Sequence, residues 1–268
     1  MQINPAFPLS GIVRHFLVIE SDRHAMMRIF SDGNTGIVFN YGDALSYQYE
    51  TGPGTALLPA GFLYGQLDTF RNVRANGRIR LLIAVLYPFG AAALCQMPAS
   101  ELRNRIIGCD ELFRYNAGSI TDEIANSVTI FDKIHAAERF LLSQMQGSGS
   151  ADALIANAIS LIHKEHGLMP VARLARLSGV TERQLQRKFE AHIGISPKRY
   201  AGIARMQYAL KMLRRKPAGL SLAGVACESG FFDQAHLIRE MKNLSGLTPG
   251  QYLGPHDLLA ANLIQISR

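Results

Sequence analysis

The sequence has little of what disulfide frameworks, zinc sites and membrane anchors need. Its three cysteines, Cys95, Cys109 and Cys227, are an odd number without C-x-x-C spacing or an accompanying histidine pair. No uninterrupted apolar run approaches the roughly 18 residues of a membrane span, and no basic segment followed by an apolar core opens the chain. We therefore expect a soluble cytoplasmic protein with reduced thiols and no cofactor.

Signatures of catalysis are also missing. The sequence contains no nucleophile elbow and no phosphate-binding loop. A metal-binding barrel would cluster histidines on its strands, but His15 and His24 lack an H-x-H neighbour, and His236 has no partner at ligand spacing. We expect neither a metal site nor catalytic residues, and we expect Cys227 to lie in a helix core. A catalytic amino-terminal region stays a competing hypothesis.

Positive charge is concentrated in one part of the chain. Residues 1–150 carry 12 Lys and Arg against 13 Asp and Glu, whereas residues 151–268 carry 16 against 8. The whole excess of +7 therefore belongs to the carboxyl-terminal part. Such a local excess suits a polyanionic partner such as nucleic acid, although a solvated basic surface would give the same count.

A pattern of turns and apolar positions occurs twice between Val171 and Tyr252. The copies are VARLARLSGVTERQLQRKFEAHIGISPKRY and SLAGVACESGFFDQAHLIREMKNLSGLTPGQY. The matched pairs are Ser178-Gly179 with Ser229-Gly230, Leu185 with Leu237, Phe189 with Met241, Gly194 with Gly246, Pro197 with Pro249 and Tyr200 with Tyr252. The offset grows from 51 to 52, which places one extra turn residue near Phe231-Phe232. A repeat of this length indicates duplicated supersecondary units.

Each copy predicts a helix-turn-helix unit. In the first, a short helix ends at Ser178-Gly179, and Thr181 with Gln184 forms a capping box for a helix from residue 182 to 193. Its exposed face presents Arg183, Gln184, Gln186 and Arg187. Arg pairs bidentately with guanine and Gln with adenine in the major groove, so these are candidate base-reading residues. An ordinary polar helix face is the alternative.

The second unit repeats this design. Asp233 is its expected cap, and the candidate base-reading residues are Gln234, Ala235, His236 and Arg239. A helix over residues 197–216 joins the units and spans about 30 Å, close to the roughly 34 Å between successive major grooves on one face of DNA. Candidate phosphate contacts are Thr181, Lys188, Lys198 and Arg199.

The amino-terminal part predicts an antiparallel β-barrel or sandwich. Short apolar runs separated by turn residues predict strands at 12–19, 26–30, 36–40, 45–49, 56–58, 63–67 and 79–87. No helix-length segment intervenes for parallel crossovers. Helical periodicity then predicts helices at 91–96, 100–107 with Ser100 as cap, 120–127, 131–145 and 151–165. The apolar stripe of residues 131–145 suits either a second subunit or its own barrel.

The resulting fold class is α+β, with a β-rich domain followed by an all-α domain. We predict an effector-binding or dimerisation domain at 1–146, a flexible linker at 147–151, a DNA-binding domain at 152–255 and a tail at 256–268. The linker is the Gly- and Ser-rich run that follows Gln146.

The duplicated region resembles the AraC/XylS family of bacterial transcription regulators. The residues that carry the resemblance are LARLSGVTERQLQRKF, GISPKRY and ESGFFDQAHLIREMK followed by GLTPGQY. The resemblance covers roughly 100 residues and implies that the eight candidate residues lie on base-reading positions. It also implies a cupin-like amino-terminal domain that senses a small-molecule effector, forms a homodimer, or does both.

The expected function is that of a sequence-specific transcription regulator acting on double-stranded DNA and RNA polymerase, with no membrane partner. A third hypothesis is control of transcription without any ligand. It requires an amino-terminal barrel whose interior is filled by large apolar side chains. Neither the effector nor the residues that would bind it follow from the sequence.

Overall fold

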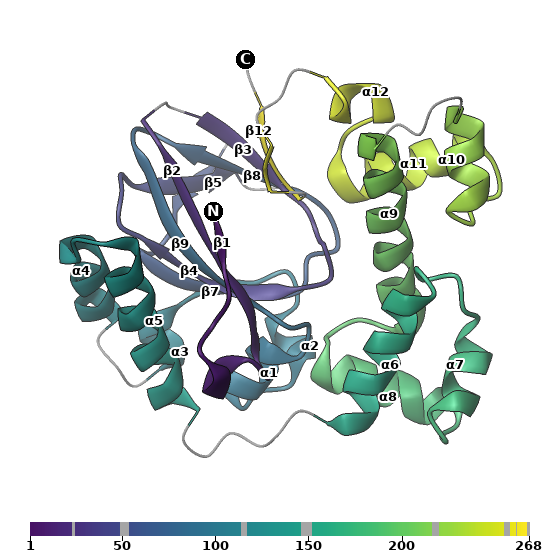
Figure 1. Cartoon of the computed structure of the whole chain (residues 1–268), viewed down its shortest axis with the longest axis horizontal. Coiled ribbons are helices and arrows are strands. Elements are labelled where there is room, and N and C mark those ends of the chain that lie inside the picture. The colour runs from purple at the N-terminus through teal and green to yellow at the C-terminus, as the bar shows by residue number, and fades with distance from the viewer. Residues whose placement is uncertain are drawn as a thin grey trace.

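The computed structural model describes residues 1–22, 25–48, 54–113, 117–145, 152–215, 220–254, 258–260 and 262–266. A β-rich amino-terminal unit lies beside a helical carboxyl-terminal unit (Figure 1). The predicted linker at 147–151 lies outside the described residues.

Two six-stranded antiparallel sheets form the amino-terminal unit. The first contains, in spatial order, β1 (Gln2–Ile3), β2 (Val13–Ser21), β9 (Ile79–Leu86), β4 (Thr35–Asn40), β7 (Gly61–Tyr64) and β10 (Ile106–Gly108). The second contains β11 (Leu258–Ala260), β12 (Leu263–Ile266), β3 (Ala25–Ile29), β8 (Arg71–Ala75), β5 (Leu45–Gln48) and β6 (Thr55–Leu57). The predicted antiparallel architecture is therefore confirmed.

Strand β9 shows why the apolar run of the first sheet is continuous. Its residues alternate between the interior of the barrel and the helices behind the sheet. Leu81, Ile83 and Val85 belong to the buried cluster between the sheets. Leu82, Ala84 and Leu86 belong to the cluster shared with the trailing helices. Because both faces of the strand are buried, neither set of positions is polar.

Short helices cover the outer face of the first sheet. They are η1 (Phe7–Leu9), α1 (Gly90–Cys95), α2 (Ala99–Leu102), α3 (Cys109–Leu112), α4 (Ala117–Asn126) and α5 (Ile130–Gln144). Thr129 and Asp132 form a capping box at the start of α5. The apolar stripe of α5, including Ile134, Phe140 and Leu141, is buried in the core of its own unit. Of the two alternatives for this stripe, the structure shows packing on the barrel.

The predicted helix at 100–107 is wrong. Helix α2 ends at Leu102, its N-cap is Pro98 rather than Ser100, and Ile106 and Ile107 lie in strand β10. Ile107 pairs with Leu63 of β7, and its side chain is buried. The apolar residues whose spacing suggested a helix therefore form an edge strand of the first sheet. Strand β8 was also missed, because Val73 and Ala75 are the only apolar residues of its sequence RNVRA and the other three are polar.

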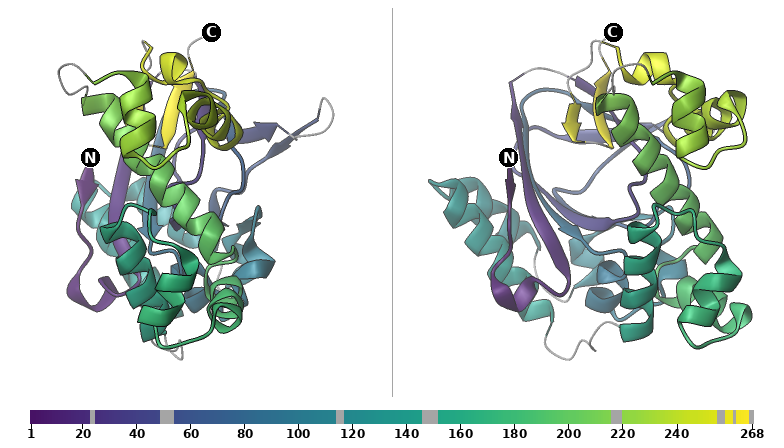
Figure 2. Two further views of the ribbon diagram at one scale, coloured as in Figure 1. Left: turned by 90° about the vertical axis from the view of Figure 1, so that its right-hand side faces the viewer. Right: turned by 45° about the vertical axis from the view of Figure 1, so that its right-hand side comes forward.

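The carboxyl-terminal unit consists of helices in the predicted order. They are α6 (Ala153–Lys164), α7 (Val171–Leu177), α8 (Glu182–His192), α9 (Pro197–Arg215), α10 (Leu222–Glu228), α11 (Gln234–Ser245) and α12 (Pro249–Tyr252). Two helix-turn-helix heads, α7–α8 and α10–α11, lie at opposite ends of α9, as all views show (Figures 1 and 2). Among the described residues, no helix is long and apolar enough to cross a membrane.

The two units are docked on each other through α9 and the end of the chain. Arg199 Nη2 donates to the Asp68 carbonyl oxygen at 2.5 Å, and Gln207 Nε2 donates to the Ser31 carbonyl oxygen at 3.0 Å. Strand β12, which follows the second head, pairs with β3 of the barrel. The chain therefore returns to its amino-terminal unit after completing both heads.

Gly194 offers a test of this docking. It has φ +86°, and a Cβ added there would lie 2.6 Å from the Ala99 carbonyl oxygen of the barrel unit. Gly179 has a similar φ of +68° but nothing within 4 Å of a Cβ. Both Ala substitutions carry the left-handed strain of about 1–2 kcal/mol. We expect Gly194→Ala to lose a further ~1–3 kcal/mol by overpacking.

Urea unfolding of the two variants and the parent chain measures this difference. Equal losses for Gly194→Ala and Gly179→Ala would show that Ala99 does not crowd a side chain at residue 194, which contradicts close docking there.

Candidate nucleic-acid interface and barrel cavity

The first head is built around the predicted cap and turn. Gly179 takes φ +68° after α7, and the Gln184 backbone N–H donates to Thr181 Oγ1 at 3.2 Å. The Gln184 side-chain oxygen in turn accepts from the Thr181 backbone N–H at 2.9 Å. This reciprocal pair is the capping box that the sequence predicts. It fixes the start of α8.

The second head repeats the geometry with one residue more. Gly230 takes φ +71°, and Asp233 Oδ1 accepts from the His236 backbone N–H at 2.6 Å. Two residues, Phe231 and Phe232, separate the turn glycine from this cap, where Val180 alone stands in the first head. The predicted extra turn residue is therefore confirmed.

Repeated apolar positions have the same role in both heads. At three repeated positions the side chains of both heads are at most 2% exposed. These pairs are Leu185 and Leu237, Phe189 and Met241, and Tyr200 and Tyr252. The hydroxyl of Tyr200 and His163 Nε2 of α6 lie 2.8 Å apart, so this buried polar group has a partner. The repeat in the sequence is a repeat of the packing.

The predicted base-reading residues lie on the outward faces of α8 and α11. Arg183, Gln184, Gln186, Arg187, Gln234, Ala235 and Arg239 are exposed, and His236 is half-buried. Within the described part of the chain, no hydrogen bond or ion pair engages the guanidinium groups of Arg183, Arg187 and Arg239.

Three of the predicted reading residues make local contacts. The side-chain oxygen of Gln184 accepts from Thr181 in the capping box. Gln186 Nε2 donates to Glu190 Oε1 at 3.1 Å. His236 Nδ1 accepts from the Phe232 backbone N–H at 3.3 Å, and its ring packs edge-on against Phe231. Among the charged candidates, the guanidinium groups of the three arginines are thus available to bind a partner such as DNA.

The predicted phosphate-binding residues differ in whether their side chains already have a partner within the chain. Lys198 is exposed, and Thr181 is engaged in its cap. Arg199 binds the Asp68 carbonyl oxygen of the barrel unit. Lys188 forms an ion pair with Asp152, the N-cap of α6, and His192 lies 3.7 Å from the same carboxylate.

Sequence reasoning missed one exposed aromatic residue beside the second reading helix. Phe232 is 92% exposed and directly precedes the cap Asp233. Its neighbour Phe231 is buried, so the doubled phenylalanine at the extra turn residue was the signal. Cys227 was expected in the core of α10 but is exposed, whereas Cys109 is buried.

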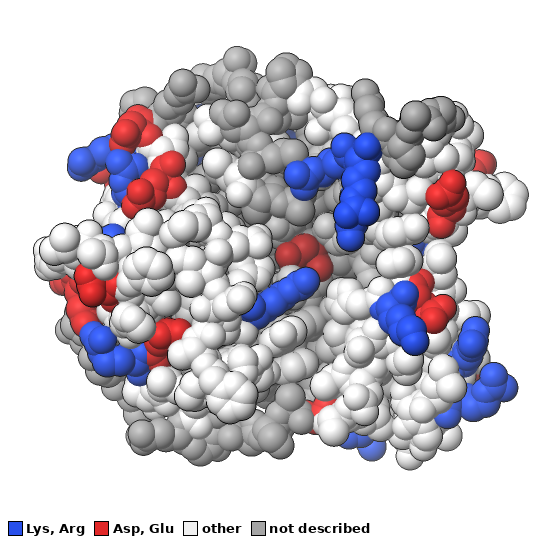
Figure 3. All heavy atoms as spheres, viewed as in Figure 1, with Lys and Arg blue, Asp and Glu red and all other residues white. Residues whose placement is uncertain are grey.

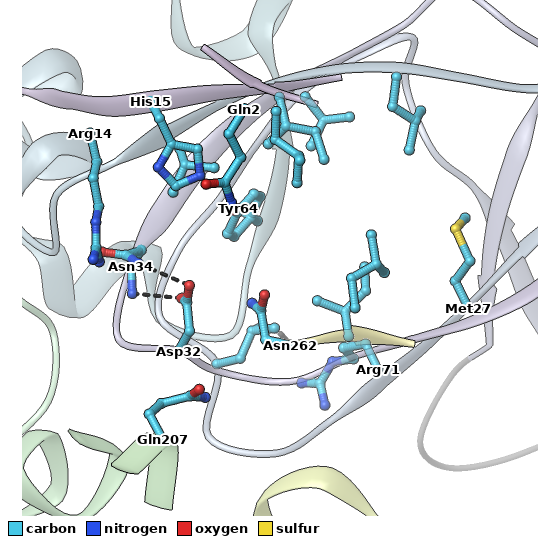
Figure 4. Close-up of a pocket in the computed structure, with 18 of the residues that line it drawn as sticks. Gln2, Arg14, His15, Met27, Asp32, Asn34, Tyr64, Arg71, Gln207 and Asn262 are labelled. Atoms are coloured by element: carbon cyan, nitrogen blue, oxygen red, sulfur yellow. Dashed lines mark hydrogen bonds between the residues drawn. The ribbon is translucent and has the colours of Figure 1, made fainter. Parts of the chain in front are cut away.

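A cavity of about 890 Å³ lies between the two sheets and opens toward α9. The apolar wall comes from inward-facing strand residues, among them Leu17, Met27, Val38, Phe62, Val73 and Ile83. These side chains leave the interior hollow instead of filling it, which argues against the hypothesis of a barrel without a ligand. Figure 4 shows Gln207 of α9 at the same opening as Asp32 and Asn34.

The mouth of the cavity is mainly basic. Arg14, His15 and Arg71 come from the barrel, and Lys211, Arg214 and Arg215 come from α9. Among the described lining residues the acidic one is Asp32, whose oxygens accept from the backbone and side chain of Asn34 at 3.0 and 2.9 Å. Figure 3 shows this face hollowed between the units, with basic side chains around the hollow.

The surroundings of two histidines at the mouth favour their neutral form. Burial lowers the pKa of His15 and of His163, the charge of Arg14 lowers both further, and Asp32 opposes the shift. The positive charge of the opening therefore comes mainly from its arginine and lysine side chains. In the described part of the chain, no three His, Cys, Asp or Glu side chains gather as metal ligands.

The Asp152–Lys188 pair predicts a pH-dependent contribution to stability. Burial opposes ionisation of Asp152, but the Lys188 hydrogen bond and two backbone donors outweigh it and lower the pKa of Asp152. Asp152→Asn keeps a capping side chain and removes the ion pair. We expect it to lower the free energy of unfolding by less than about 1 kcal/mol at pH 7.

The loss should fade as pH falls, because a carboxylate with a lowered pKa stabilises the fold above its unfolded pKa of about 3.9. Urea unfolding between pH 7 and 3 measures this, and a pH-independent difference would show that the ion pair is not its cause.

Comparisons with known proteins agree with both halves of this architecture. A family described as a helix-turn-helix domain matches residues 174–254, and a domain of unknown function, DUF6597, matches residues 1–108. An uncharacterized HTH-type transcriptional regulator of Haemophilus influenzae is 27% identical over 64% of this chain and 57% of its own length. A putative AraC-like transcription regulator of Streptomyces antibioticus is 29% identical over 39% of this chain and 34% of its own.

The structure of ToxT from Vibrio cholerae is similar over 89% of this chain and 97% of its own, with 12% identity and a TM-score of 0.51. That similarity shows a shared fold with two domains. The chain spans about half the length of the Haemophilus relative. Its duplicated heads match a helix-turn-helix family and are similar to those of AraC-like transcription regulators, and its overall fold is that of ToxT.

Proposed function

We propose that this protein is a sequence-specific DNA-binding transcription regulator that reads two major-groove segments. The observation that carries the proposal is the placement of exposed arginines on α8 and α11, at opposite ends of one helix. Helix α9 has 19 residues and so extends over about 28 Å. That length is near the roughly 34 Å repeat of the major groove, which suits two heads on one face of a duplex.

Each head has a distinct share in this proposal. Arg183 and Arg187 lie one turn apart on α8, so the first head offers two guanidinium groups to guanine edges. The second head offers Arg239 with Gln234 beside a small Ala235. We propose that the first head contributes more base discrimination and that the second acts more as a positional clamp on the duplex.

The phosphate contacts follow from the free basic groups. Lys198 is exposed, whereas Lys188 and Arg199 have partners within the chain. We propose that Lys198 contacts phosphate directly and that Arg199 does so after its bond to the barrel opens. Each such contact adds to the salt dependence of binding.

Substitution of the reading arginines tests the function. On a site selected from randomised duplex, Arg187→Ala and Arg239→Ala should each lose about 1–3 kcal/mol of binding free energy and relax base preference at the contacted position. The loss for Arg187→Ala should be larger. Gel-shift titrations at one fixed salt concentration give both affinities.

Arg74→Ala is the matched control, because Arg74 is an exposed arginine on β8 of the barrel. It removes the same charge far from the reading helices and should leave site preference unchanged. Wild-type affinity of both reading variants, or losses equal to that of Arg74→Ala, would contradict base reading by these heads.

For the barrel, we propose a sensor that binds an amphipathic molecule with an anionic head group. The apolar wall suits a hydrocarbon body, and the basic mouth suits a carboxylate or similar anion. Structures of ToxT, which shares this fold, are described as bound to an unsaturated fatty acid and to (E)-4-(8-methylnaphthalen-1-yl)but-3-enoic acid. Both are amphipathic carboxylic acids.

Oleate serves as the probe for this class of ligand. We expect Arg14→Met and Lys211→Met each to weaken oleate binding to the full chain about tenfold, which corresponds to ~1.4 kcal/mol for a charge-assisted contact. Oleyl alcohol, which lacks the carboxylate, should bind both variants and the parent chain alike. Calorimetric titration below the micelle concentration measures the affinities.

If neither variant changes oleate affinity, the basic mouth is not the head-group site. If oleate does not bind the parent chain, the proposed ligand class is wrong.

We also propose contact with RNA polymerase and formation of a homodimer, on the resemblance to AraC-like regulators, and action in the cytoplasm, on the proposed DNA binding. A catalytic barrel is the competing function. The sequence relatives compared above are described as transcription regulators, which favours regulation over catalysis.

A further inference from the structure

Strand β12 lies between the cavity and the second head. It pairs with β3 in the register Leu263 with Ile29 and Ile264 with Arg28. Asn262 anchors its start, because its backbone oxygen accepts from the Phe30 N–H and its Nδ2 donates to the Phe30 carbonyl oxygen, both at 3.1 Å. A segment from the end of the chain thus completes a sheet of the sensor.

Adjacent residues of β12 face opposite sides of that sheet. Leu263 lines the cavity and is buried in the cluster between the two sheets. Ile264 is fully buried in the other direction, in the same apolar cluster as the cores of the two heads. One peptide unit therefore separates a cavity wall from the packing of the DNA-binding domain.

The residue paired with Ile264 holds the end of the second reading helix. Arg28 Nη1 donates to the carbonyl oxygen of Gly246, the C-cap of α11, at 3.1 Å. Its guanidinium lies 4.3 Å from the centre of the Phe70 ring and is oriented by Asn72 Oδ1 at 3.0 Å. A cation at a helix C-terminus is favourable, because the unpaired carbonyls there carry partial negative charge.

Only glycine fits under this contact. A Cβ at Gly246 would lie 2.5 Å from the Phe70 ring and 2.8 Å from Arg28 Nη1, and Gly246 has φ +69°. We call Arg28, Phe70 and Ile264 the α11 clamp. It is separate from the contacts of the first head, which docks through Gly194 and Arg199.

We infer that β12 couples the cavity to the second head: a molecule that occupies the cavity displaces Leu263, shifts Ile264 and Arg28 with it, and releases α11 from the α11 clamp. The first head keeps its own docking contacts, so occupancy changes the freedom of one head relative to the other. The coupling rests on the proposed sensor function, because it gives the cavity a ligand.

A double-mutant cycle on the full chain, read by hydrogen exchange, tests the coupling without any ligand. Leu263→Trp adds volume on the cavity side, and the pair Arg28→Ala with Ile264→Ala removes the α11 clamp. Each change should speed amide exchange in α11 and α12 about tenfold and leave α7 and α8 unchanged. Because both act through the same contact, the combined variant should exchange no faster than the clamp variant alone.

Arg74→Ala is the control for loss of a surface arginine and should not alter exchange in either head. If Leu263→Trp does not yield folded protein by circular dichroism, Leu263→Phe takes its place with a smaller expected increase. Additive effects in the cycle, or equal acceleration of α7–α8 and α11–α12, would overturn the coupling.

Oleate then separates this inference from the sensor proposal. If oleate binds and speeds exchange of α11 in the parent chain but not in the clamp variant, the coupling is supported. If oleate binds and acts equally on both, the coupling fails while the sensor proposal stands. If oleate does not bind, the ligand class fails, and the ligand-free cycle still decides the coupling.

Discussion

Burial of α9 on several sides at once is the constraint on which the rest of the molecule depends. Its buried residues include Tyr200, Ala201, Ile203, Ala204, Met206, Ala209, Leu210, Met212 and Leu213. They serve the cores of both heads, while Gln207 and Lys211 on the same helix face the cavity. A helix with partners on most sides lacks one polar face. Both heads and the barrel therefore pack against one helix.

Local chemistry made the carboxyl-terminal domain predictable from sequence. Caps such as Thr181 and Asp233, turn glycines and helical periodicity act within a few residues, and the structure places each as expected. The β-rich unit was predicted in class and in most strands. Strands β1, β8, β10, β11 and β12 were missed, because their existence depends on partners elsewhere in the chain. Two isoleucines and a glycine, as in β10, carry no periodicity that separates strand from helix.

The candidate sites also differ in whether local sequence or distant packing determines them. The reading residues follow from the heads, so sequence alone named Arg183, Arg187 and Arg239. The cavity mouth combines Arg14 of β2 with Lys211 of α9, and only the docking of the two units brings them together. The engagement of Lys188 by Asp152 was hidden for the same reason, since Asp152 caps a different helix. Sequence reasoning therefore reached the residues of each element but not the partners that the fold gives them.

The polar contacts that dock the units on each other are individually weak enough for a ligand to change. Its polar contacts, Arg199 to Asp68, Gln207 to Ser31 and Arg28 to Gly246, are single bonds from a side chain to a backbone oxygen. Each contributes about 1 kcal/mol net. A ligand shifts an equilibrium only by its difference in affinity for the two states. A micromolar ligand binds with about 8 kcal/mol, so a modest share of that energy is sufficient to break one such contact and leave the barrel intact.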